Sequence, residues 1–267
     1  MLVSLPMYDL PELMEAHRHF WSGLRRHLAA EGFSDTPEIL DWPRDLDAAW
    51  ASPDLLLSQT CGYPLRRQLD GRVRLLGVPH YEAPGCVSYL YSSALIVHVD
   101  NPHLSLEAFA GSAAAFNEIG SQSGYSALRH AVAPFAHKGR FFATAIETGR
   151  HEHSIDAIRK GKADIAAIDA VTFALLQRHQ PERLAGIRRL AHTMPVPGLP
   201  FITALSRPAD EIARLQRALQ AAFADPTLAE PRAALLLKDI SFPDIAVYHD
   251  IDRLEREAVA AGYPTLA

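Results

Sequence analysis

Residues 113–136 read AAAFNEIGSQSGYSALRHAVAPFA, and this stretch indicates the fold class. The short apolar run at 113–116 reads as a buried strand, and the segment 124–136 reads as a helix. A polar loop rich in serine and glycine joins them. Strands that alternate with helices in this way are typical of α/β proteins with mostly parallel sheets.

The same alternation continues in both directions along the chain. Strands are expected at residues 2–5, 54–58, 72–78, 90–99, 141–146, 163–168, 187–192 and 201–205, and helices at 11–30, 154–160, 171–179, 209–223, 229–238 and 252–261. The strand at 54–58 is almost wholly apolar, which suits a sheet that is buried on both faces. We therefore predict an α/β fold with two lobes, each a mostly parallel sheet flanked by helices.

Two breaks suggest where the chain crosses between the lobes. Asp100-Asn101-Pro102 follows a long strand, and residues 194–200 contain three prolines and a glycine. Such segments favour connections over regular structure. One lobe is expected to contain residues 1–98 plus 196–267, and the other residues 99–195. Two connecting strands would form the hinge of a cleft of the Venus flytrap type.

Composition excludes several classes of function. Hydrophobic residues make up 48% of the 267 residues and charged residues 21%, which is enough apolar material for a core. Lys and Arg number 26 against 31 Asp and Glu, a net charge of −5, so no nucleic-acid partner is expected. The longest apolar runs are too short to cross a bilayer, so no membrane insertion is expected.

The cysteines and the N-terminus bear on the compartment. Cys61 and Cys86 lack the spacing of a zinc or redox motif, and free thiols are favoured over one disulfide. The first twelve residues have no basic residue before their short apolar stretch, unlike a secretory signal peptide. The protein is cytoplasmic if Met1 is the native start, and periplasmic if a leader was removed.

The loop at 117–125 is the sharpest candidate site. A strand–loop–helix junction leaves backbone N–H groups of the first helical turn without partners, and the helix dipole favours an anion there. Ser121 and Ser123 add hydroxyl donors, and Gly124 allows close approach of a ligand. The loop has no Lys or Arg, which suits a small desolvated oxyanion better than a polyphosphate. The alternative is that a serine merely caps the helix.

Other polar residues follow predicted strands, where ligands of α/β sheets bind. Ser58, Gln59 and Thr60 follow the strand at 54–58, and Tyr8 follows the first strand. The structural alternatives are an ordinary capped turn for the first three and simple packing for the tyrosine.

Two further strand ends carry titratable groups. Glu147 and His151 belong to a loop that also contains Glu152 and His153, and its His-x-His pattern raises a metal hypothesis. No further ligand motif stands out, so a ligand-facing histidine is preferred and no metal or cofactor is expected. Asp169 ends an apolar strand and needs a partner, which could be the start of the following helix.

Several motifs together resemble the phosphate/phosphonate-type solute-binding proteins of ABC transporters. The motifs are DLLLSQTCGYP, SYLYSSALIV, N-x3-SQSGY, GRHEHSIDAIRKGKADIAAIDAVTF and LPFIT, which occur in order over residues 54–205. The resemblance implies the two-lobed type 2 periplasmic-binding fold. The family often has S-T-S-G where this chain has Gln122 in the middle, which leaves a related phosphorylated or carboxylated metabolite open as the ligand.

The resemblance also implies a set of ligand-binding residues. These are Tyr8, Ser58, Gln59, Thr60, Tyr91, Ser93, Asn117, Ser121, Gln122, Ser123, Gly124, Tyr125, Glu147, His151 and Asp169, with His153 as the competing histidine. The expected function is capture of a small anionic solute by a monomer, without catalysis, with an ABC transporter permease as partner. The rival interpretations are a cytoplasmic enzyme of cofactor biosynthesis on the same fold, with acid/base roles for Glu147, His151 and Asp169, and an effector sensor.

Overall fold

The computed structural model describes residues 1–267, which divide into two compact units. Unit 1 comprises Met1–Glu82, Val87–Tyr89 and Pro197–Val247, and unit 2 comprises Ala83–Cys86, Leu90–Val196 and Tyr248–Ala267. These boundaries differ from the expected ones at residues 83–86, 90–98, 196 and 248–267, which belong to unit 2. The reason is pairing and packing: the strand at Ser93–His98 pairs within the sheet of unit 2, and the C-terminal helix packs on a helix of that unit.

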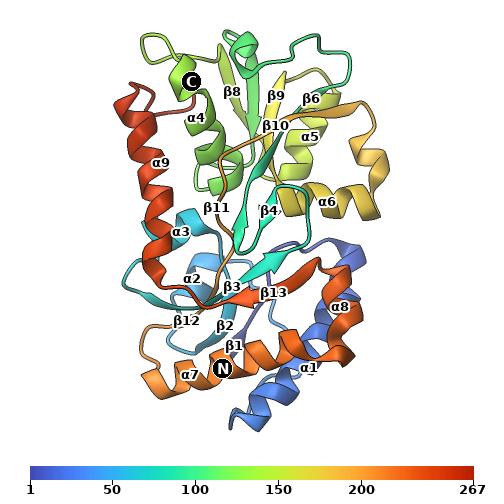
Figure 1. The fold of residues 1–267 in the computed structure, drawn as a ribbon, viewed down its shortest axis with the longest axis vertical. Helices are drawn as coiled ribbons and strands as arrows, with labels where there is room; N and C mark the ends of the chain where they lie inside the picture. The colour runs from blue at the N-terminus through green and yellow to red at the C-terminus, as the bar shows by residue number, and fades with distance from the viewer. The chain divides into compact units, whose positions relative to one another are not determined.

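Unit 1 is built on a five-stranded sheet with the order β1-β2-β12-β3-β13 (Figure 1). Its strands are β1 (Leu2–Val3), β2 (Leu55–Gln59), β3 (Val73–Tyr81), β12 (Phe201–Ala204) and β13 (Leu237–Ser241). Its helices are α1 (Met14–Ala30), α2 (Leu46–Trp50), α3 (Gly62–Arg67), α7 (Ala209–Ala224) and α8 (Ala229–Ala234), with short 3-10 turns at Pro11–Leu13, Pro226–Leu228 and Ile245–Tyr248.

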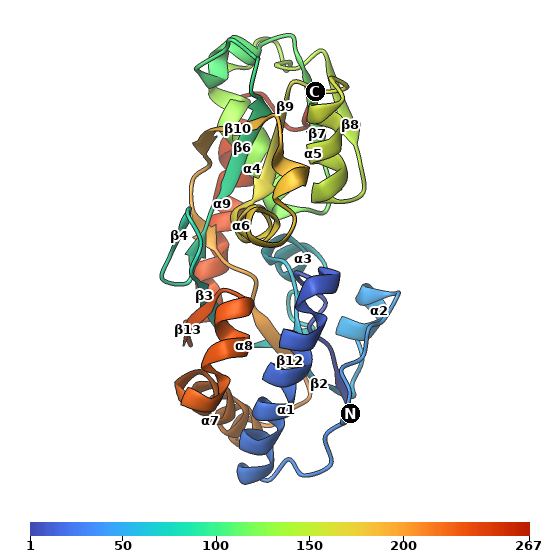
Figure 2. The same ribbon diagram turned by 90° about the vertical axis from the view of Figure 1, so that its right-hand side faces the viewer.

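The core of unit 1 forms where α1 packs against α7 and α8 (Figure 2). Phe20 of α1 meets Phe223 of α7 edge to face, with 5.7 Å between the ring centroids, and Phe223 also contacts Phe201 of β12. All five residues of β2 are buried, as the apolar run predicted. This packing fixes the end of β2, where polar residues follow.

Unit 2 is built on a second five-stranded sheet, with the order β10-β6-β9-β7-β8. Its strands are β6 (Ser93–His98), β7 (Ala113–Phe116), β8 (Thr144–Glu147), β9 (Ile165–Asp169) and β10 (Ile187–His192). Its helices are a π-helical turn at Gln122–Ser126, α4 (Ala127–Val132), α5 (His151–Arg159), α6 (Ala170–His179) and α9 (His249–Ala260), with 3-10 turns at Leu106–Phe109, Ala133–Phe135 and Pro181–Leu184.

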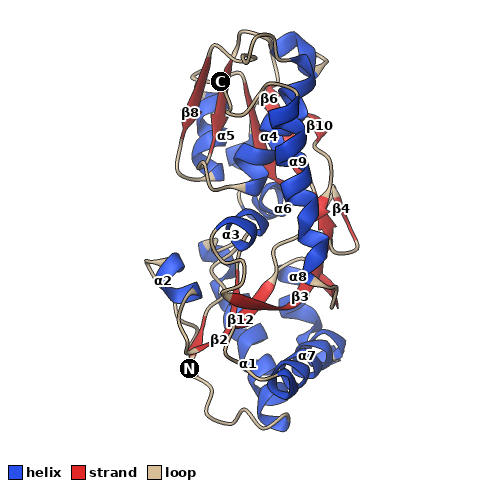
Figure 3. Cartoon of the chain, turned by 90° about the vertical axis from the view of Figure 1, so that its left-hand side faces the viewer, coloured by secondary structure: helices blue, strands red, loops and turns tan.

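Alternation along the strands of unit 2 assigns side chains to the two faces of the sheet. One face contributes Leu95, Val97, Ala114, Phe116, Ile165 and Ala167 to a buried cluster that includes Leu128 of α4 and Ala258 of α9. Helices α4 and α9 lie side by side in this unit (Figure 3). Helix α5 packs on β6, β7 and β9. The sheet is thus buried on both sides, as its apolar strands require.

Both sheets are mixed, so the α/β class is confirmed but the prediction of mostly parallel sheets is wrong. In unit 1 only β1 and β2 pair in parallel, because β12 and β13 run opposite to their neighbours. In unit 2, β7 pairs in parallel with β8 and β9, whereas β6 is antiparallel to both β9 and β10. A third sheet has the order β11-β5-β4, with β4 (Cys86–Val87), β5 (Leu90–Tyr91) and β11 (Val196–Pro197).

Several of the expected elements are wrong in part, and three of the differences have a clear physical reason or bear on the site. The helix predicted at 229–238 ends at Ala234, and β13 follows it as an edge strand whose exposed Lys238 and Asp239 disguise the strand pattern. The loop predicted around His151 is the start of α5. The helix predicted at 124–136 begins two residues earlier with a π-helical turn.

Both cysteines are free thiols, in agreement with the interpretation preferred from the sequence. None of the helices combines the length and hydrophobicity that a membrane span requires.

Replacing Gly85 with Ala is expected to destabilise the fold by about 2–4 kcal/mol. Gly85 has φ +98°, and an added Cβ would lie 2.4 Å from Nδ1 of His192 and 2.6 Å from Oγ of Ser92. Urea unfolding measures the loss. Gly111→Ala is the matched control, because Gly111 has φ +79° but open space around it, so only backbone strain of about 1 kcal/mol is expected. Equal losses in the two variants would contradict the steric argument.

Candidate functional site

The serine loop, defined here as residues 117–125, begins a helix with an unusual first turn. Ser121 is the N-cap, and its Oγ accepts a hydrogen bond from the Gly124 N–H at 3.0 Å. The Ser126 N–H bonds to the Ser121 carbonyl at 3.1 Å, five residues back, so the turn is π-helical. The N–H groups of Gln122 and Ser123 lie in this first turn, where no preceding helical carbonyl can accept them. Such turns occur often at functional sites.

Ser123 is held by side chains from two other elements of unit 2. Its Oγ lies 2.9 Å from Nε2 of His151, the first residue of α5. Ser93 at the start of β6 donates its hydroxyl to the Ser123 carbonyl at 2.9 Å. The Oγ atoms of Ser121 and Ser123 are 3.4 Å apart. The structure therefore brings together four of the predicted residues, Ser93, Ser121, Ser123 and His151.

The His151 imidazole is neutral at ordinary pH. Burial is the main cause that lowers its pKa from 6.5 to about 4, and the nearby positive charge of Arg150 adds to the shift. Its Nδ1 is buried and has no hydrogen-bond partner. The serine loop thus offers uncharged donors: backbone N–H groups, serine hydroxyls and a neutral imidazole.

Asp169 is buried beside this group. It is the register partner of Ser93 across β6 and β9 and is only 3% exposed. Its Oδ1 accepts the N–H groups of Val171 and Thr172 at 2.8 and 2.9 Å, so it caps α6 as the structural alternative predicted. Burial and, secondarily, the Asp169 charge raise the pKa of Cys86 to about 12, which keeps that thiol protonated.

The remaining predicted ligand-binding residues of unit 2 include both buried and exposed side chains. The Tyr125 ring packs on Phe116 in the core, and its hydroxyl accepts the Leu266 N–H, so its ligand contact stays a prediction. Asn117 packs its carboxamide against Gly124, whose added Cβ would lie 1.9 Å from the Asn117 Oδ1. Glu147 is exposed at the end of β8, and Tyr91 is buried in β5.

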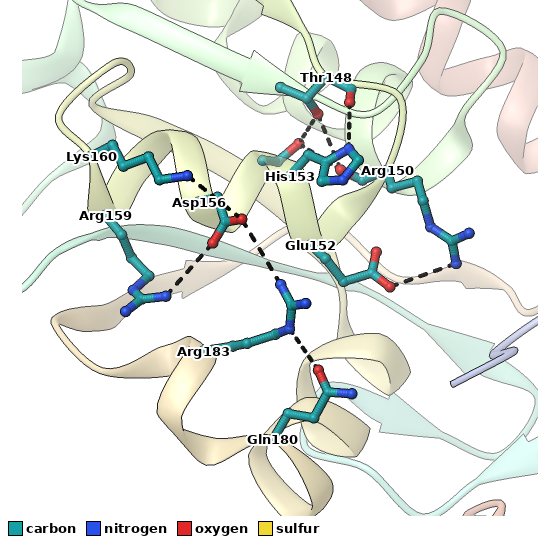
Figure 4. A network of polar contacts seen from close by, with 10 residues as sticks. Thr148, Arg150, Glu152, His153, Asp156, Arg159, Lys160, Gln180 and Arg183 are labelled. Atoms are coloured by element: carbon teal, nitrogen blue, oxygen red, sulfur yellow. Dashed lines mark hydrogen bonds and ion pairs between the residues drawn. The ribbon is translucent and has the colours of Figure 1, made fainter. Parts of the chain in front are cut away.

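The histidine pair lies on the first turn of α5 (Figure 4). His153 is exposed and donates from Nδ1 to the Thr148 carbonyl at 3.0 Å, whereas His151 contacts the serine loop. Arg150 pairs with Glu152, and Asp156 lies within 4.0 Å of Arg159, Lys160 and Arg183. No group of three or more His, Cys, Asp or Glu side chains is placed to hold a metal ion.

The loop before α5 is tied to the end of β7. The N–H and Oγ1 of Thr148 both donate to the Phe116 carbonyl at 2.9 Å, and the Gly149 N–H donates to the Asn117 carbonyl at 2.7 Å. Thr148 Oγ1 also lies 2.7 Å from Ser154 Oγ of α5. These bonds fix the position of His151 relative to the serine loop. Sequence reasoning missed Thr148, because nothing local to it signals this role.

In unit 1, two of the three predicted polar residues at the end of β2 have partners inside the unit. Ser58 Oγ lies 2.7 Å from Ser4 Oγ and accepts the Trp50 indole N–H at 3.2 Å. Gln59 donates from Nε2 to the Tyr81 hydroxyl at 2.8 Å and to the Leu199 carbonyl at 3.0 Å. They therefore hold the local structure.

Thr60 and Tyr8 are the other two predicted ligand-binding residues of unit 1. Thr60 is fully buried, and its Oγ1 has no hydrogen-bond partner. Tyr8 adopts φ +61°, which is strained for a residue with a side chain, and the His17 Nε2 donates to its carbonyl at 3.2 Å. The Tyr8 ring meets Tyr81 edge to face, with centroids 5.2 Å apart. Tyr81, at the end of β3, was not predicted, although its place at a strand end follows the same rule.

Solved structures with the same fold include binding proteins of ABC transporters. A binding protein component of an ABC phosphonate transporter from Pseudomonas aeruginosa superposes with a TM-score of 0.75 at 15% identity, covering 98% of this chain and 87% of that chain. PhnD1 from Prochlorococcus marinus in complex with methylphosphonate gives 0.73 at 12% identity, covering 96% and 97%. A Xanthomonas citri protein bound to ATP gives 0.72 at 15% identity, covering 98% of each chain. The chain therefore has the two-lobed α/β fold of periplasmic binding proteins.

The family follows from the sequence match. Residues 52–247 match the family described as "ABC transporter, phosphonate, periplasmic substrate-binding protein". The chain belongs to this family of ABC transporter substrate-binding proteins. No curated protein matches it significantly.

Proposed function

We propose that the protein is a solute-binding component that captures a small oxyanion, phosphonate-like, phosphate-like or related, for an ABC-type transporter without transforming it. The observation that carries this proposal is the bond of 2.9 Å between Ser123 Oγ and the neutral His151 imidazole at the start of a helix. Fixed N–H and O–H donors can replace the water molecules around an anion without a positively charged side chain. A small oxyanion is the group that this arrangement suits best.

The Ser123–His151 pair also makes an enzyme worth considering. In many enzymes a histidine next to a serine acts as the base that activates the serine as a nucleophile. Two observations weigh against it. Burial holds the pKa of His151 near 4, which makes its imidazole a weak base. Its Nδ1 has no partner, whereas a catalytic histidine is oriented by a third group. The geometry therefore supports binding over nucleophilic catalysis.

Tyr8 and Thr60 of unit 1, and Tyr91, Asn117, Glu147 and Asp169 of unit 2, stay predictions as ligand contacts. The same holds for the monomeric state, for the permease partner and for enclosure of the ligand by both units.

Isothermal titration of the purified chain with methylphosphonate, inorganic phosphate, methanesulfonate and acetate tests the proposal. Binding of at least one phosphorus or sulfur oxyanion with a dissociation constant in the micromolar range or tighter is expected. Mass spectrometry of the same mixtures separates the two classes, because a receptor returns the ligand unchanged. Conversion of the bound compound would support the enzyme, and no binding of any of the four would contradict the proposed ligand class.

A further inference from the structure

Gln122 belongs to the serine loop, and both polar atoms of its side chain are buried without a hydrogen-bond partner. The residue as a whole is 0% exposed. Its neighbours differ: Ser121 caps Gly124, and Ser123 meets His151. A buried amide left in this state costs free energy, so it calls for a functional explanation.

The place of Gln122 in the helical turn indicates where its amide is expected. Gln122 is the first residue of the helical turn after the N-cap Ser121. Side chains in helices project toward the N-terminus and cover the turn before their own Cα. By this rule, the amide of Gln122 is expected over the helix start, beside the N–H groups that the proposed oxyanion would meet.

The charges around this turn disfavour a ligand with two negative charges. Residues 117–125 contain no Lys or Arg. His151 is neutral, since burial lowers its pKa to about 4. Asp169 ends β9, the strand on which this turn packs, and it is 3% exposed. Arg150 acts on His151 but pairs with Glu152. A second full negative charge on the ligand would therefore add repulsion with Asp169 that this cation only partly offsets.

We infer that Gln122 selects an oxyanion that keeps one proton. The inference rests on the proposed function. The amide nitrogen needs an acceptor, which an ionised oxygen supplies, and the amide oxygen needs a donor, which a hydroxyl on the same acid group supplies. A hydrogen phosphonate satisfies both atoms. A sulfonate of the same shape and charge has no proton, so it places an oxygen lone pair against the amide oxygen.

The test compares methylphosphonate with methanesulfonate by titration at about pH 5.5, below the second ionisation of a phosphonate, where both ligands are monoanions. Wild type is expected to prefer the phosphonate by about tenfold or more, the scale of one lost hydrogen bond at a site that needs a donor. Gln122→Met, which removes both polar atoms at similar volume, is expected to reduce this preference to near unity. Gln220→Met makes the same change at an exposed position of α7 and should keep the wild-type preference.

A stability measurement separates selection from a structural role. Without ligand, Gln122→Met is expected to raise the melting temperature by about 2–4 °C, because an apolar side chain replaces an unpartnered buried amide. A lower melting temperature together with an unchanged preference would show that the amide is structural and would overturn the inference. Equal affinity of wild type for both ligands would also overturn it while the proposed function stands. If neither ligand nor any other oxyanion bound, both the inference and the proposed function would be contradicted.

Discussion

Replacing Ser123 with Trp is expected to weaken oxyanion binding by about 100-fold or more, so that titration of the tightest oxyanion ligand gives no measurable heat. Ser123 is 5% exposed and is placed between the helix start and His151. An indole at this position would fill the space that the anion needs and would remove the hydroxyl donor. Affinity by titration, with circular dichroism to verify folding, measures the effect.

Two further variants make the result interpretable. Ser123→Ala removes only the hydroxyl and should keep the fold, with a loss of about tenfold. Ser206→Trp introduces the same indole at an exposed serine of unit 1 and should bind like wild type. Unchanged affinity in both Ser123 variants would refute the placement of the anion at the serine loop.

Acid is expected to destabilise the protein through His151 by up to about 3 kcal/mol. Burial holds the folded pKa at about 4, below the value of 6.5 for an unperturbed histidine. As the pH falls, the unfolded chain therefore takes up this proton first. This loss of stability is absent above about pH 7, grows as the pH falls through 6.5, and is complete near pH 4.

Urea unfolding at pH 7 and at pH 4.5 measures this loss, and variants isolate its source. His151→Gln keeps a side-chain nitrogen for Ser123 but does not titrate, so its stability should fall less than that of wild type over the same range. His153→Gln is the control, because His153 is exposed on the same turn of α5 and should leave the wild-type pH dependence intact. Parallel curves for all three proteins would show that His151 does not titrate at the low pKa.

Sequence patterns predicted the parts of the fold that depend on continuous burial. The strand β7 occurs at the residues expected and β2 within one residue of them, because apolar runs bounded by turns leave few alternatives. The strand β13 was missed, since an edge strand needs only one buried face and its exposed residues are charged. Antiparallel insertion of β12 was also not predictable, because pairing partners distant in sequence leave no local signal.

The candidate site was predictable in outline from its place at strand ends. The serine loop and His151 were predicted and do meet. The direction of side chains was not predictable: Gln59 donates to Tyr81, and Tyr125 packs in the core of unit 2. A hydrogen-bonding residue after a strand serves a ligand or its own loop, and local sequence does not distinguish these uses. The contacts of each side-chain atom in the structure distinguish them.

The position of β12 between β2 and β3 has a consequence for biosynthesis. The strands β2 and β3 are synthesised long before Phe201–Ala204. Their edges therefore stay unpaired while most of the second unit is translated. Non-local pairing of this kind slows folding and leaves apolar edges exposed to other chains. The N-terminal segment is therefore expected to be prone to aggregation until Phe201–Ala204 has been made.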